Sequence, residues 1–525
     1  MLIKNGTIVD GTLRQAYPGS VLIRDGRIQA IGNDLDCDDP LVIDATHHII
    51  APGFIDTHSH SDLRLLIDSK LEAKVRQGIT TEIVGQDGIA MAPLPARYID
   101  CWRKNIAGLD GESDAVDWNY GTTRGYLEAL DRRRVQTNVG CLAPHGNLRM
   151  EAMGMANRKA SRRELEAMIT ILKRELDSGA IGLSTGLIYI PCAYGDTEEL
   201  IALCKVVAEY GRIFVVHQRS EADAILESMD EIIRIGKETG VKVHFSHFKV
   251  CGRNNWPKLE AALEKLDQAR ADGLEISLDQ YPYAAGSTML SVILPPWAHE
   301  GGTDRLLERL QNRDARRKMA REIERGGAGW DNFIDFAGCE GIYITSVKHS
   351  RNQPAVGKNL LELGGWKGKD PLEAAMDLLL EEENAVGMVD FYGKEDHVIQ
   401  ILRRPEQNVC TDGLLSGKPH PRVYGAFPRI IHRYVVQKEL LSLEEAIHKM
   451  TFKPAQTFSL RNRGALREGY YADLVVFDLD RIRDLGTYEQ PDQYPAGIEK
   501  VIINGTPVFG GREVTPAGRG RILTG

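Results

Sequence analysis

Ala-Pro-Gly-Phe-Ile-Asp-Thr-His-Ser-His, residues 51–60, is an apolar, strand-like run that ends in His58 and His60. Side chains two positions apart on a strand share a face, so the two imidazoles are expected to point the same way. A His-x-His pair alone often occurs by chance on a surface or in a core and binds no metal. Two neutral imidazoles on one face nevertheless suit a divalent metal such as zinc, and the stretch predicts part of a metal site.

Three further residues end short β-branched runs in the same manner. His217 closes Arg-Ile-Phe-Val-Val-His, His247 closes Val-Lys-Val-His-Phe-Ser-His, and Asp412 closes Asn-Val-Cys-Thr-Asp. A helical pattern follows each run, so all of these residues are expected at the carboxyl ends of strands. In a barrel of alternating strands and helices those ends converge on one mouth, where the chemistry is found. The pattern predicts an α/β metal-dependent hydrolase built as a TIM-like barrel of alternating strands and helices.

The periodicity changes near both ends of the chain. Residues 1–50 and 467–525 contain short strand-like pieces with Asn-Gly turns, and we expect them to form one small β-domain. Strand and helix patterns alternate over residues 51–466, for example a helix over 161–178 followed by a strand over 180–184, which predicts the catalytic barrel. Residues 295–340 are rich in charge and glycine and fit no barrel unit, so a lid-like insertion is expected there.

Composition limits the function further. Of the 525 residues, 42% are hydrophobic, which is enough for a substantial core. The net charge is -9, and basic and acidic residues are interspersed, so the chain offers no broad positive surface to a nucleic acid. We expect no signal peptide and no membrane span. The eight cysteines lie far apart without a Cys-x-x-Cys pair, so a cytoplasmic protein with reduced thiols is expected.

The chain resembles the N-acyl-D-amino-acid deacylases (D-aminoacylases) of the amidohydrolase superfamily nearly from end to end. The stretches that carry the resemblance are Gly-Phe-Ile-Asp-Thr-His-Ser-His at 53–60, Gly-Leu-Ser-Thr-Gly-Leu-Ile-Tyr at 182–189, Ser-His-Phe-Lys at 246–249, Asp-Gln-Tyr-Pro-Tyr at 279–283 and His-Pro-Arg at 420–422. The family has a metal-centred (β/α)8 barrel with a small β-sandwich built from both termini. This implied fold agrees with the division derived from the strand pattern.

The resemblance also implies how the site works. His217 and His247 would hold the tighter metal, and His58 and His60 a second position, with one zinc ion or two. Zinc lowers the pKa of bound water towards 7 and polarises a carbonyl oxygen. Asp412 would take the proton of the attacking water and pass it to the departing amine. The alternative for Asp412 is a helix cap, since Thr-Asp-Gly is also turn chemistry.

The chain departs from the family at the residue that would bridge the two metal positions. Residues 80–88 read Thr-Thr-Glu-Ile-Val-Gly-Gln-Asp-Gly, so Asp87 stands where many members of the family have a metal-ligating cysteine. A carboxylate suits zinc, manganese and other divalent ions about equally, which leaves the identity of the metal open. Asp87 could instead be a turn residue. The strand at 180–184 contains no lysine, which argues against the carboxylated-lysine bridge of the cyclic amidohydrolases.

The resemblance points to four residues that would bind the free carboxylate of the substrate: Lys249, Tyr281, Ser287 and Arg422. A guanidinium offers a planar fork that matches a carboxylate, and lysine and tyrosine add further donors. Lys249 stands two residues beyond His247 and shares its face if the strand continues. The alternative is that Lys249 and Arg422 are solvent-facing loop residues.

Three functions remain open at this point. The first is hydrolysis of N-acyl-D-amino acids to a carboxylate and a free D-amino acid, by a monomer or homodimer that binds this small-molecule substrate, with no nucleic acid or membrane partner. The second is a related amidohydrolase that acts on cyclic amides or dipeptides, because sites change chemistry on one fold. The third is a metal-binding protein without turnover. The preferred side chain and acyl group cannot be derived from the sequence.

Overall fold

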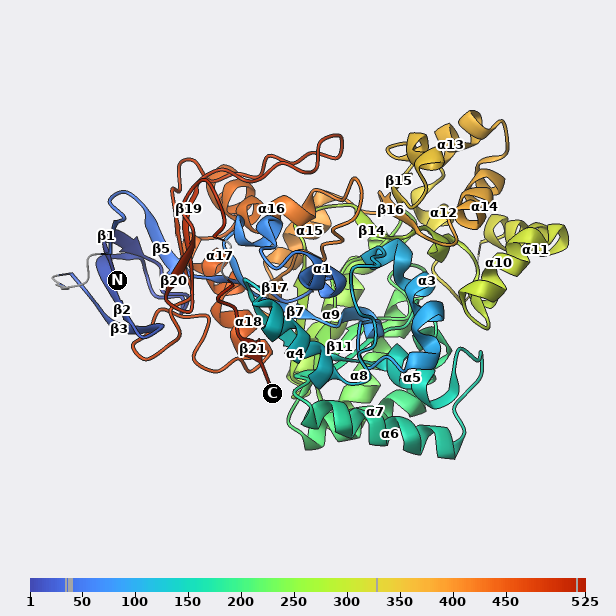
Figure 1. Ribbon diagram of the computed structural model, residues 1–525, viewed down its shortest axis with the longest axis horizontal. Coiled ribbons are helices and arrows are strands. Elements are labelled where there is room, and N and C mark those ends of the chain that lie inside the picture. The colour runs from blue at the N-terminus through green and yellow to red at the C-terminus, as the bar shows by residue number, and fades with distance from the viewer. Residues whose placement is uncertain (34, 36–40, 327–328, 516–517) are drawn as a thin grey trace.

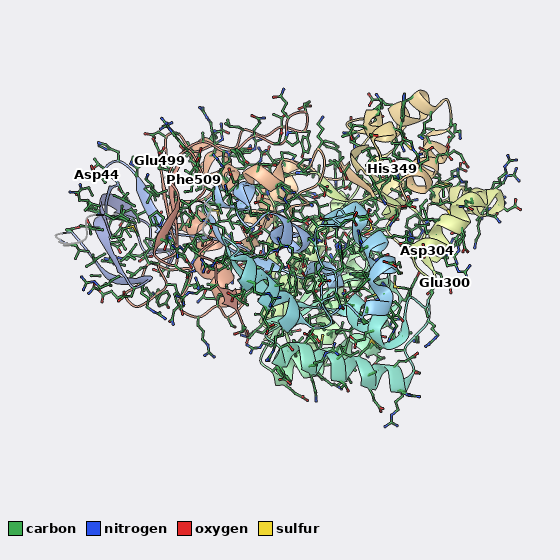
Figure 2. All side chains as sticks on the ribbon, in the orientation of Figure 1. Asp44, Glu300, Asp304, His349, Glu499 and Phe509 are labelled. Carbon is green, nitrogen blue, oxygen red and sulfur yellow. The ribbon has the colours of Figure 1, made fainter. Side chains whose placement is uncertain are left out.

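The computed structural model describes residues 1–33, 35, 41–326, 329–515 and 518–525. Residues 34, 36–40 and 516–517 of the predicted terminal domain, and 327–328 of the predicted lid, lie outside this part. Figure 1 shows a strand-rich region with the N-terminus at one end of the long axis, a barrel in the middle and a helical region at the other end. Figure 2 labels Asp44, Glu499 and Phe509 in the strand-rich region and Glu300, Asp304 and His349 in the helical region.

Parallel strands that pair in chain order form the barrel. In the described part of the chain they are β6 (Phe54–Asp56), β7 (Ile79–Val84), β8 (Asn138–Cys141) with its continuation β9 (Ala143–Pro144), β10 (Gly182–Gly186), β11 (Ile213–His217), β12 (Lys242–Phe245), β13 (Ile276–Gln280) and β17 (Gln407–Val409). The last and first strands meet where Ser59 bridges to Gly413 and the Asp412 N–H donates to the His58 carbonyl over 2.9 Å. The barrel therefore closes beside His58.

Amphipathic helices cover the outside of the barrel. They include α4 (Thr123–Arg133), α6 (Arg162–Asp177), α7 (Thr197–Glu209), α8 (Ile225–Thr239), α9 (Leu259–Ala271), α15 (Glu395–Leu402) and α17 (Leu443–Met450). A capping box between Ser161 and Glu164 begins α6, and Met168, Leu172 and Leu176 on its inner face are buried against the strands. No helix among the described residues is both long and apolar enough to cross a membrane.

One end of the barrel interior is filled with apolar side chains. Ile83, Leu142, Ile181, Ile213 and Val215 pack with Phe458, which follows α18 (Phe452–Thr457). Ile181 and Ile213 lie where their strands begin, so this plug closes the amino end of the barrel. The polar residues of a functional site are therefore expected at the opposite, carboxyl end.

Both ends of the chain contribute to a second sheet. The described strands of this sheet pair in the order β20 (Thr506–Phe509), β19 (Ile498–Ile503), β18 (Leu474–Phe477), β5 (Ile49–Pro52), β1 (Leu2–Ile8), β2 (Tyr17–Arg24) and β3 (Arg27–Gly32), with β4 (Val42–Asp44) beside β1. Leu474 and Ile502 pack with Ile3 and Val21 in an inner core, so the two halves of the sheet face one another as in a sandwich. The alternate residue Val475 faces the barrel helices.

The helical region is a long excursion between β13 and β17. It begins with β14 (Gly286–Met289), which pairs with β16 (Val386–Asp390), and β16 pairs in turn with β15 (Ile342–Val347). Its helices are α10 (Thr303–Gln311), α11 (Arg313–Glu324), α12 (Phe333–Ala337), α13 (Leu360–Lys367) and α14 (Pro371–Glu381). The excursion therefore starts earlier and ends later than the 295–340 insertion expected from composition, because its sheet joins strands about one hundred residues apart.

Candidate metal centre

The predicted histidines meet at the carboxyl ends of the barrel strands. His58 and His60 follow β6, His217 ends β11 and His247 follows β12. The Nε2 atoms of His58 and His60 lie 3.3 Å apart, and His217 Nδ1 lies 2.9 Å from His247 Nε2. The four imidazoles thus form two pairs whose ring nitrogens converge, as the spacing of the sequence predicted.

Two carboxylates join these pairs. Asp87 Oδ2 lies 3.6 Å from His58 Nε2 and 3.5 Å from His60 Nε2, while Asp87 Oδ1 lies 3.8 Å from His247 Nε2. Asp412 Oδ1 lies 3.7 Å from His58 Nε2 and 3.3 Å from His60 Nε2. Asp87 therefore spans both histidine pairs, and Asp412 faces only the first.

The backbone is strained at three of these residues. Asp87 has φ 55°, His247 φ 34° and Asp412 φ 47°, in the left-handed region that costs a non-glycine residue about 1–3 kcal/mol. The next residue, Gly88 (φ 69°), packs so closely that a Cβ atom would lie 2.6 Å from Cys192 Sγ. Strain that persists in a tightly packed setting points to function, because it aims the three side chains into the shared space.

Burial and charge set the protonation of the cluster. Burial lowers the pKa of His217 to about 4. Burial also opposes the charged form of His60 and His247, yet the neighbouring carboxylates raise the pKa of His60 to about 10 and that of His247 to about 9. The negative potential that holds protons on these rings also favours a divalent cation, which would displace those protons on binding.

The side chains present fit a divalent metal. Three sets of potential ligand atoms each lie within 4.8 Å of one another: His58, His60 and Asp412; His58, Asp87 and His247; His217, Glu221 and His247. Asp87 Oδ1 and His217 Nε2 are buried without a hydrogen-bond partner among the described atoms. Buried polar atoms without partners are costly, and imidazole with carboxylate is a ligand set that zinc and manganese accept.

A buried carboxylate fixes the loop that carries His247. Asp279 Oδ1 accepts a hydrogen bond from the backbone N–H of His247, and its Oδ2 accepts one from the Thr57 hydroxyl over 2.8 Å. The His244 ring also lies 2.9 Å from this oxygen. Burial would raise the pKa of Asp279, but His244 and the other neighbours lower it to about 2, so this anchor is ionised. Such partners orient ligands and tune their basicity.

Sequence reasoning missed Glu221. Its Oε1 lies 3.1 Å from His247 Nδ1, and its Oε2 lies 2.7 Å from Lys249 Nζ and 3.8 Å from His217 Nε2. Despite its burial, Lys249 and the histidines lower the pKa of Glu221 to about 2. The only sign of this role in the sequence is that Glu221 stands four residues after His217. This spacing brings Glu221 to the cluster only because the loop after β11 turns back towards the site.

The four predicted carboxylate-binding residues lie around the cluster. Lys249 pairs with Glu221, the Tyr281 hydroxyl lies 2.7 Å from that of Tyr392, and Ser287 Oγ donates to the Met388 carbonyl over 2.8 Å. Arg422 is fully buried, with Nη1 2.9 Å from Asp412 Oδ2 and its guanidinium 4.4 Å from the centre of the Tyr281 ring.

Arg422 also donates through Nη2 to the carbonyl oxygen of Ser287 over 3.0 Å, so it lies behind Asp412. Burial would raise the pKa of Asp412, but Arg422 and His60 lower it well below its usual value. Asp412 is therefore an ionised carboxylate at neutral pH. The geometry thus gives Arg422 two contacts that hold Asp412 and Ser287 in place.

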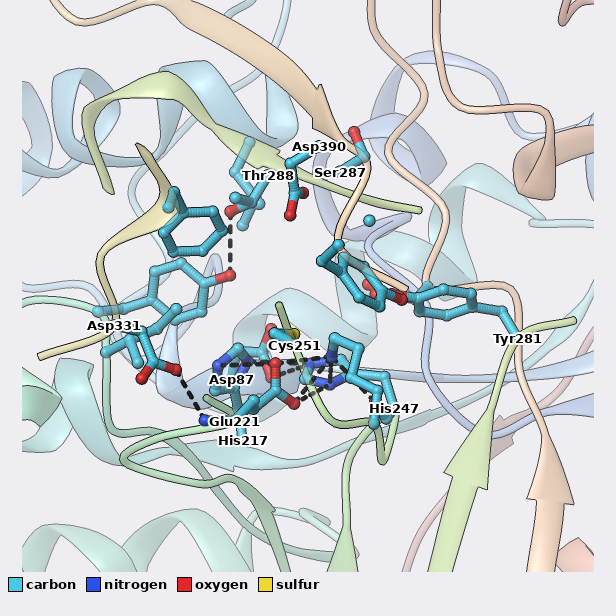
Figure 3. A pocket seen from close by; sticks show the side chains of 18 of the residues that line it. Asp87, His217, Glu221, His247, Cys251, Tyr281, Ser287, Thr288, Asp331 and Asp390 are labelled. Atoms are coloured by element: carbon cyan, nitrogen blue, oxygen red, sulfur yellow. Dashed lines mark hydrogen bonds and ion pairs between the residues drawn. The ribbon is translucent and has the colours of Figure 1, made fainter. Parts of the chain in front are cut away.

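A cavity of about 490 Å³ opens onto the cluster. It is lined by most of the predicted residues, namely His60, Asp87, His217, His247, Lys249, Tyr281, Ser287 and Asp412. Figure 3 shows Asp87, His217, Glu221 and His247 gathered on one side, with Thr288, Ser287 and Asp390 opposite them and Tyr281 and Asp331 flanking the space.

The sequence is similar to known hydrolases over its whole length. The pattern of the amidohydrolase family matches residues 41–336 and 362–509. The chain is 33% identical over 525 residues to a D-aminoacylase and 35% identical over 528 residues to an N-acyl-D-glutamate deacylase, both from Alcaligenes xylosoxydans xylosoxydans. Each alignment covers 100% of this chain, and 97% and 96% of those two relatives.

Solved structures give the same picture. The N-acyl-D-glutamate deacylase of Bordetella bronchiseptica, complexed with zinc and a phosphonate inhibitor, superposes with a TM-score of 0.85 at 33% identity, covering 100% of this chain and 99% of that one. An L-hydantoinase from Arthrobacter aurescens, which also covers 100% and 99%, gives a TM-score of 0.54 at 17% identity and shares the fold alone.

Proposed function

The chain belongs to the amidohydrolase family, and we propose that its barrel mouth hydrolyses N-acyl-D-amino acids to a carboxylate and a free D-amino acid. The observation that carries this proposal is a cluster of four histidines and two aspartates beside one cavity, in a chain whose relatives named above are a D-aminoacylase and an N-acyl-D-glutamate deacylase. The preference for D substrates rests on those relatives.

The proposed metal ligands are His58, His60, Asp87, His217 and His247. Asp87 would take the bridging position, which its two oxygens support because they face different histidine pairs. A zinc ion, or a pair of divalent ions, supplies there the Lewis acidity that activates water and an amide carbonyl at neutral pH. The Bordetella bronchiseptica relative was solved with zinc.

Asp412 is the proposed general base and acid. Its Oδ1 atom faces the cluster, so it accepts a proton from the attacking water and then donates that proton to the departing amine nitrogen. Arg422 on the other oxygen keeps Asp412 ionised before the reaction. Without Asp412 the attacking water keeps its proton, and the amine nitrogen stays unprotonated and is a poor leaving group.

Lys249, Tyr281, Ser287 and Arg422 are the proposed residues for the carboxylate of the substrate. Lys249, Tyr281 and Ser287 line the cavity on one side of the cluster, which supports this role. Arg422 adds positive charge from behind Asp412. A carboxylate held on this side places the acylated nitrogen of the same molecule next to Asp412 and the histidines.

We further propose that the excursion acts as a lid and that the protein is cytoplasmic. Asp331, Phe333 and Phe336 of the excursion line the cavity, so this region covers the substrate. The seven cysteines in the described residues are free thiols, which suits a reducing compartment.

Amine release from acyl amino acids tests the proposal. Purified protein loaded with zinc is offered N-acetyl-D- and N-acetyl-L-amino acids and dihydrouracil, beside the Asp412→Asn variant and an exposed control, Asp396→Asn. We expect release from D substrates only. Asp412→Asn should lower kcat by at least ~10²-fold with zinc content retained, and the control should match the parent protein.

Hydrolysis of dihydrouracil in preference to every acyl amino acid would contradict the proposal and favour the cyclic-amide alternative. Full activity of Asp412→Asn would remove Asp412 from the mechanism.

A further inference from the structure

A second cavity lies directly beside the metal cavity. The two share Ile188, Tyr189, Asp331 and Phe333 as a common wall. The second cavity encloses about 1040 Å³ including its opening to solvent, roughly twice the first. The second cavity is therefore the larger space next to the metal cluster.

Apolar side chains form slightly more than half of the lining of the second cavity. They come from the segment after β10, from the start of the excursion and from the segment before α12: Leu187, Ile188, Ile190, Met289, Val292, Leu294, Trp330 and Phe333. Burial of apolar surface stabilises a bound group by about 25 cal/mol per Å². The cavity therefore favours a bulky apolar substituent over a small one.

The charged groups of its described lining are already paired. Arg219 binds Glu231 at 2.9 Å and donates to the carbonyl oxygens of Ala193 and Gly195. Asp331 accepts a hydrogen bond from Ser220 Oγ over 2.6 Å and one from the backbone N–H of Glu221. Neither group is left to balance a charge on a ligand.

His299 adds no positive charge, because burial lowers its pKa to about 4. Among the lining residues that the structure describes, Arg219 is thus the only cation, and Glu231 already pairs with it. Burying an unpaired carboxylate is strongly unfavourable. An acidic substituent in this cavity would also approach Asp331, whose pKa burial raises to about 7.

Two polar atoms of the lining have no partner. Ser291 Oγ and Asn384 Oδ1 form no hydrogen bond within the described structure, although Ser291 is 1% and Asn384 2% exposed. Asn384 Oδ1 is an acceptor, and the Ser291 hydroxyl can accept as well. A ligand that brings a hydrogen-bond donor to this lining would satisfy them.

We propose that the second cavity receives the largest substituent of the substrate and selects an uncharged group with an apolar body and a hydrogen-bond-donating tip, such as an indole. This inference rests on the proposed function. That substituent is either the side chain of the D-amino acid or the acyl chain, because either one can carry such a group. It sets the chain apart from relatives that are named for D-glutamate and D-aspartate.

Two substrate series test the inference with the zinc-loaded protein. The first holds the acetyl group constant and varies the D-amino acid through alanine, leucine, phenylalanine, tryptophan and glutamate. The second holds D-alanine constant and varies the acyl group through acetyl, phenylacetyl, indole-3-acetyl and succinyl. We expect kcat/KM to rise at least ~10-fold from the smallest to the indole member in one series, which identifies the substituent, with the acidic member lowest.

Two variants connect that preference to this cavity. Val292→Trp fills it and should lower the ratio of kcat/KM between the indole and the smallest substrate at least ~10-fold. Ser291→Ala removes one unpaired oxygen and should lower the ratio between the indole and phenyl substrates several-fold. Ser178→Ala, at the end of α6 outside the cavity, is the control and should leave both ratios unchanged.

The outcomes separate the two claims. If N-acyl-D-amino acids are hydrolysed, three results would overturn this inference and leave the proposed function intact. They are a preference for the acidic substituent, no change in kcat/KM along either series, and kcat/KM ratios that neither Val292→Trp nor Ser291→Ala changes. If no N-acyl-D-amino acid is hydrolysed, both fall together.

Discussion

Asp87 places a carboxylate between the two histidine pairs. A carboxylate accepts several divalent metals, whereas a thiolate selects softer ions such as zinc. The two oxygens of Asp87 face different imidazoles within 3.8 Å, and its backbone is held in the left-handed region. The identity of this one side chain should therefore control which metal is bound.

Asp87→Cys should retain zinc and raise the ratio of zinc to manganese affinity at least ~10-fold, while Asp87→Ala should weaken the binding of both metals. Competition titrations on metal-depleted protein measure the ratio. Asp396→Ala, at an exposed helix position, is the control. An unchanged ratio in Asp87→Cys would show that Asp87 is only a turn residue.

The residues that the sequence could predict are those whose position along a strand fixes where they point. His217 ends its strand, whereas His58, His60, His247 and Asp412 follow closely after the ends of theirs, and parallel strands bring those ends together. The contacts of Glu221 with Lys249 and His247 depend instead on how a loop folds back after its strand. Spacing along the chain carries no such information.

The seam between the first and last barrel strands is held by a buried lysine. Lys74, in α2 (Glu72–Val75), donates to Asp56 Oδ2 over 2.6 Å, to Ser59 Oγ over 2.9 Å and to Thr411 Oγ1 over 2.6 Å. Its side chain is fully buried. It therefore ties β6 to the segment after β17, next to His58 and Asp412.

Lys74→Met should destabilise the fold by about 3–5 kcal/mol, because it leaves the Asp56 carboxylate buried without its charge partner. Denaturant unfolding followed by circular dichroism measures the loss. Lys70→Met, on a partly exposed residue of the same segment, is the matched control and should stay close to the parent protein. Equal stability of the two variants would contradict a structural role for the ion pair.

Local signals predicted some elements well. The helix expected over 161–178 is α6, with Ser161 and Ser178 as its caps. The strand expected at 180–184 lies two residues later, as β10, since Ala180 still bonds back to Glu175 at the end of the helix. The sheet of β14, β15 and β16 had no local signal, because its strands pair across long segments.

At the scale of the whole molecule, the barrel lies between the terminal sheet and the excursion (Figure 1). The alternation of strand and helix was sufficient to predict the barrel, because parallel strands joined by helices close in few ways. The excursion supplies walls to both cavities through Asp331 and Phe333. Substrate choice is therefore expected to depend on this region and catalysis on the barrel.

The central claim is that the metal bound by this cluster is what hydrolysis requires, and a titration tests it most directly. Zinc is added stepwise to metal-depleted protein while bound zinc and the rate of amine release from an N-acetyl-D-amino acid are measured together, with His217→Asn in parallel. The account predicts a rate that follows bound zinc and saturates at one or two ions per chain, with both lost in the variant. Full activity of the metal-free protein, or stoichiometric zinc binding without hydrolysis, would contradict it.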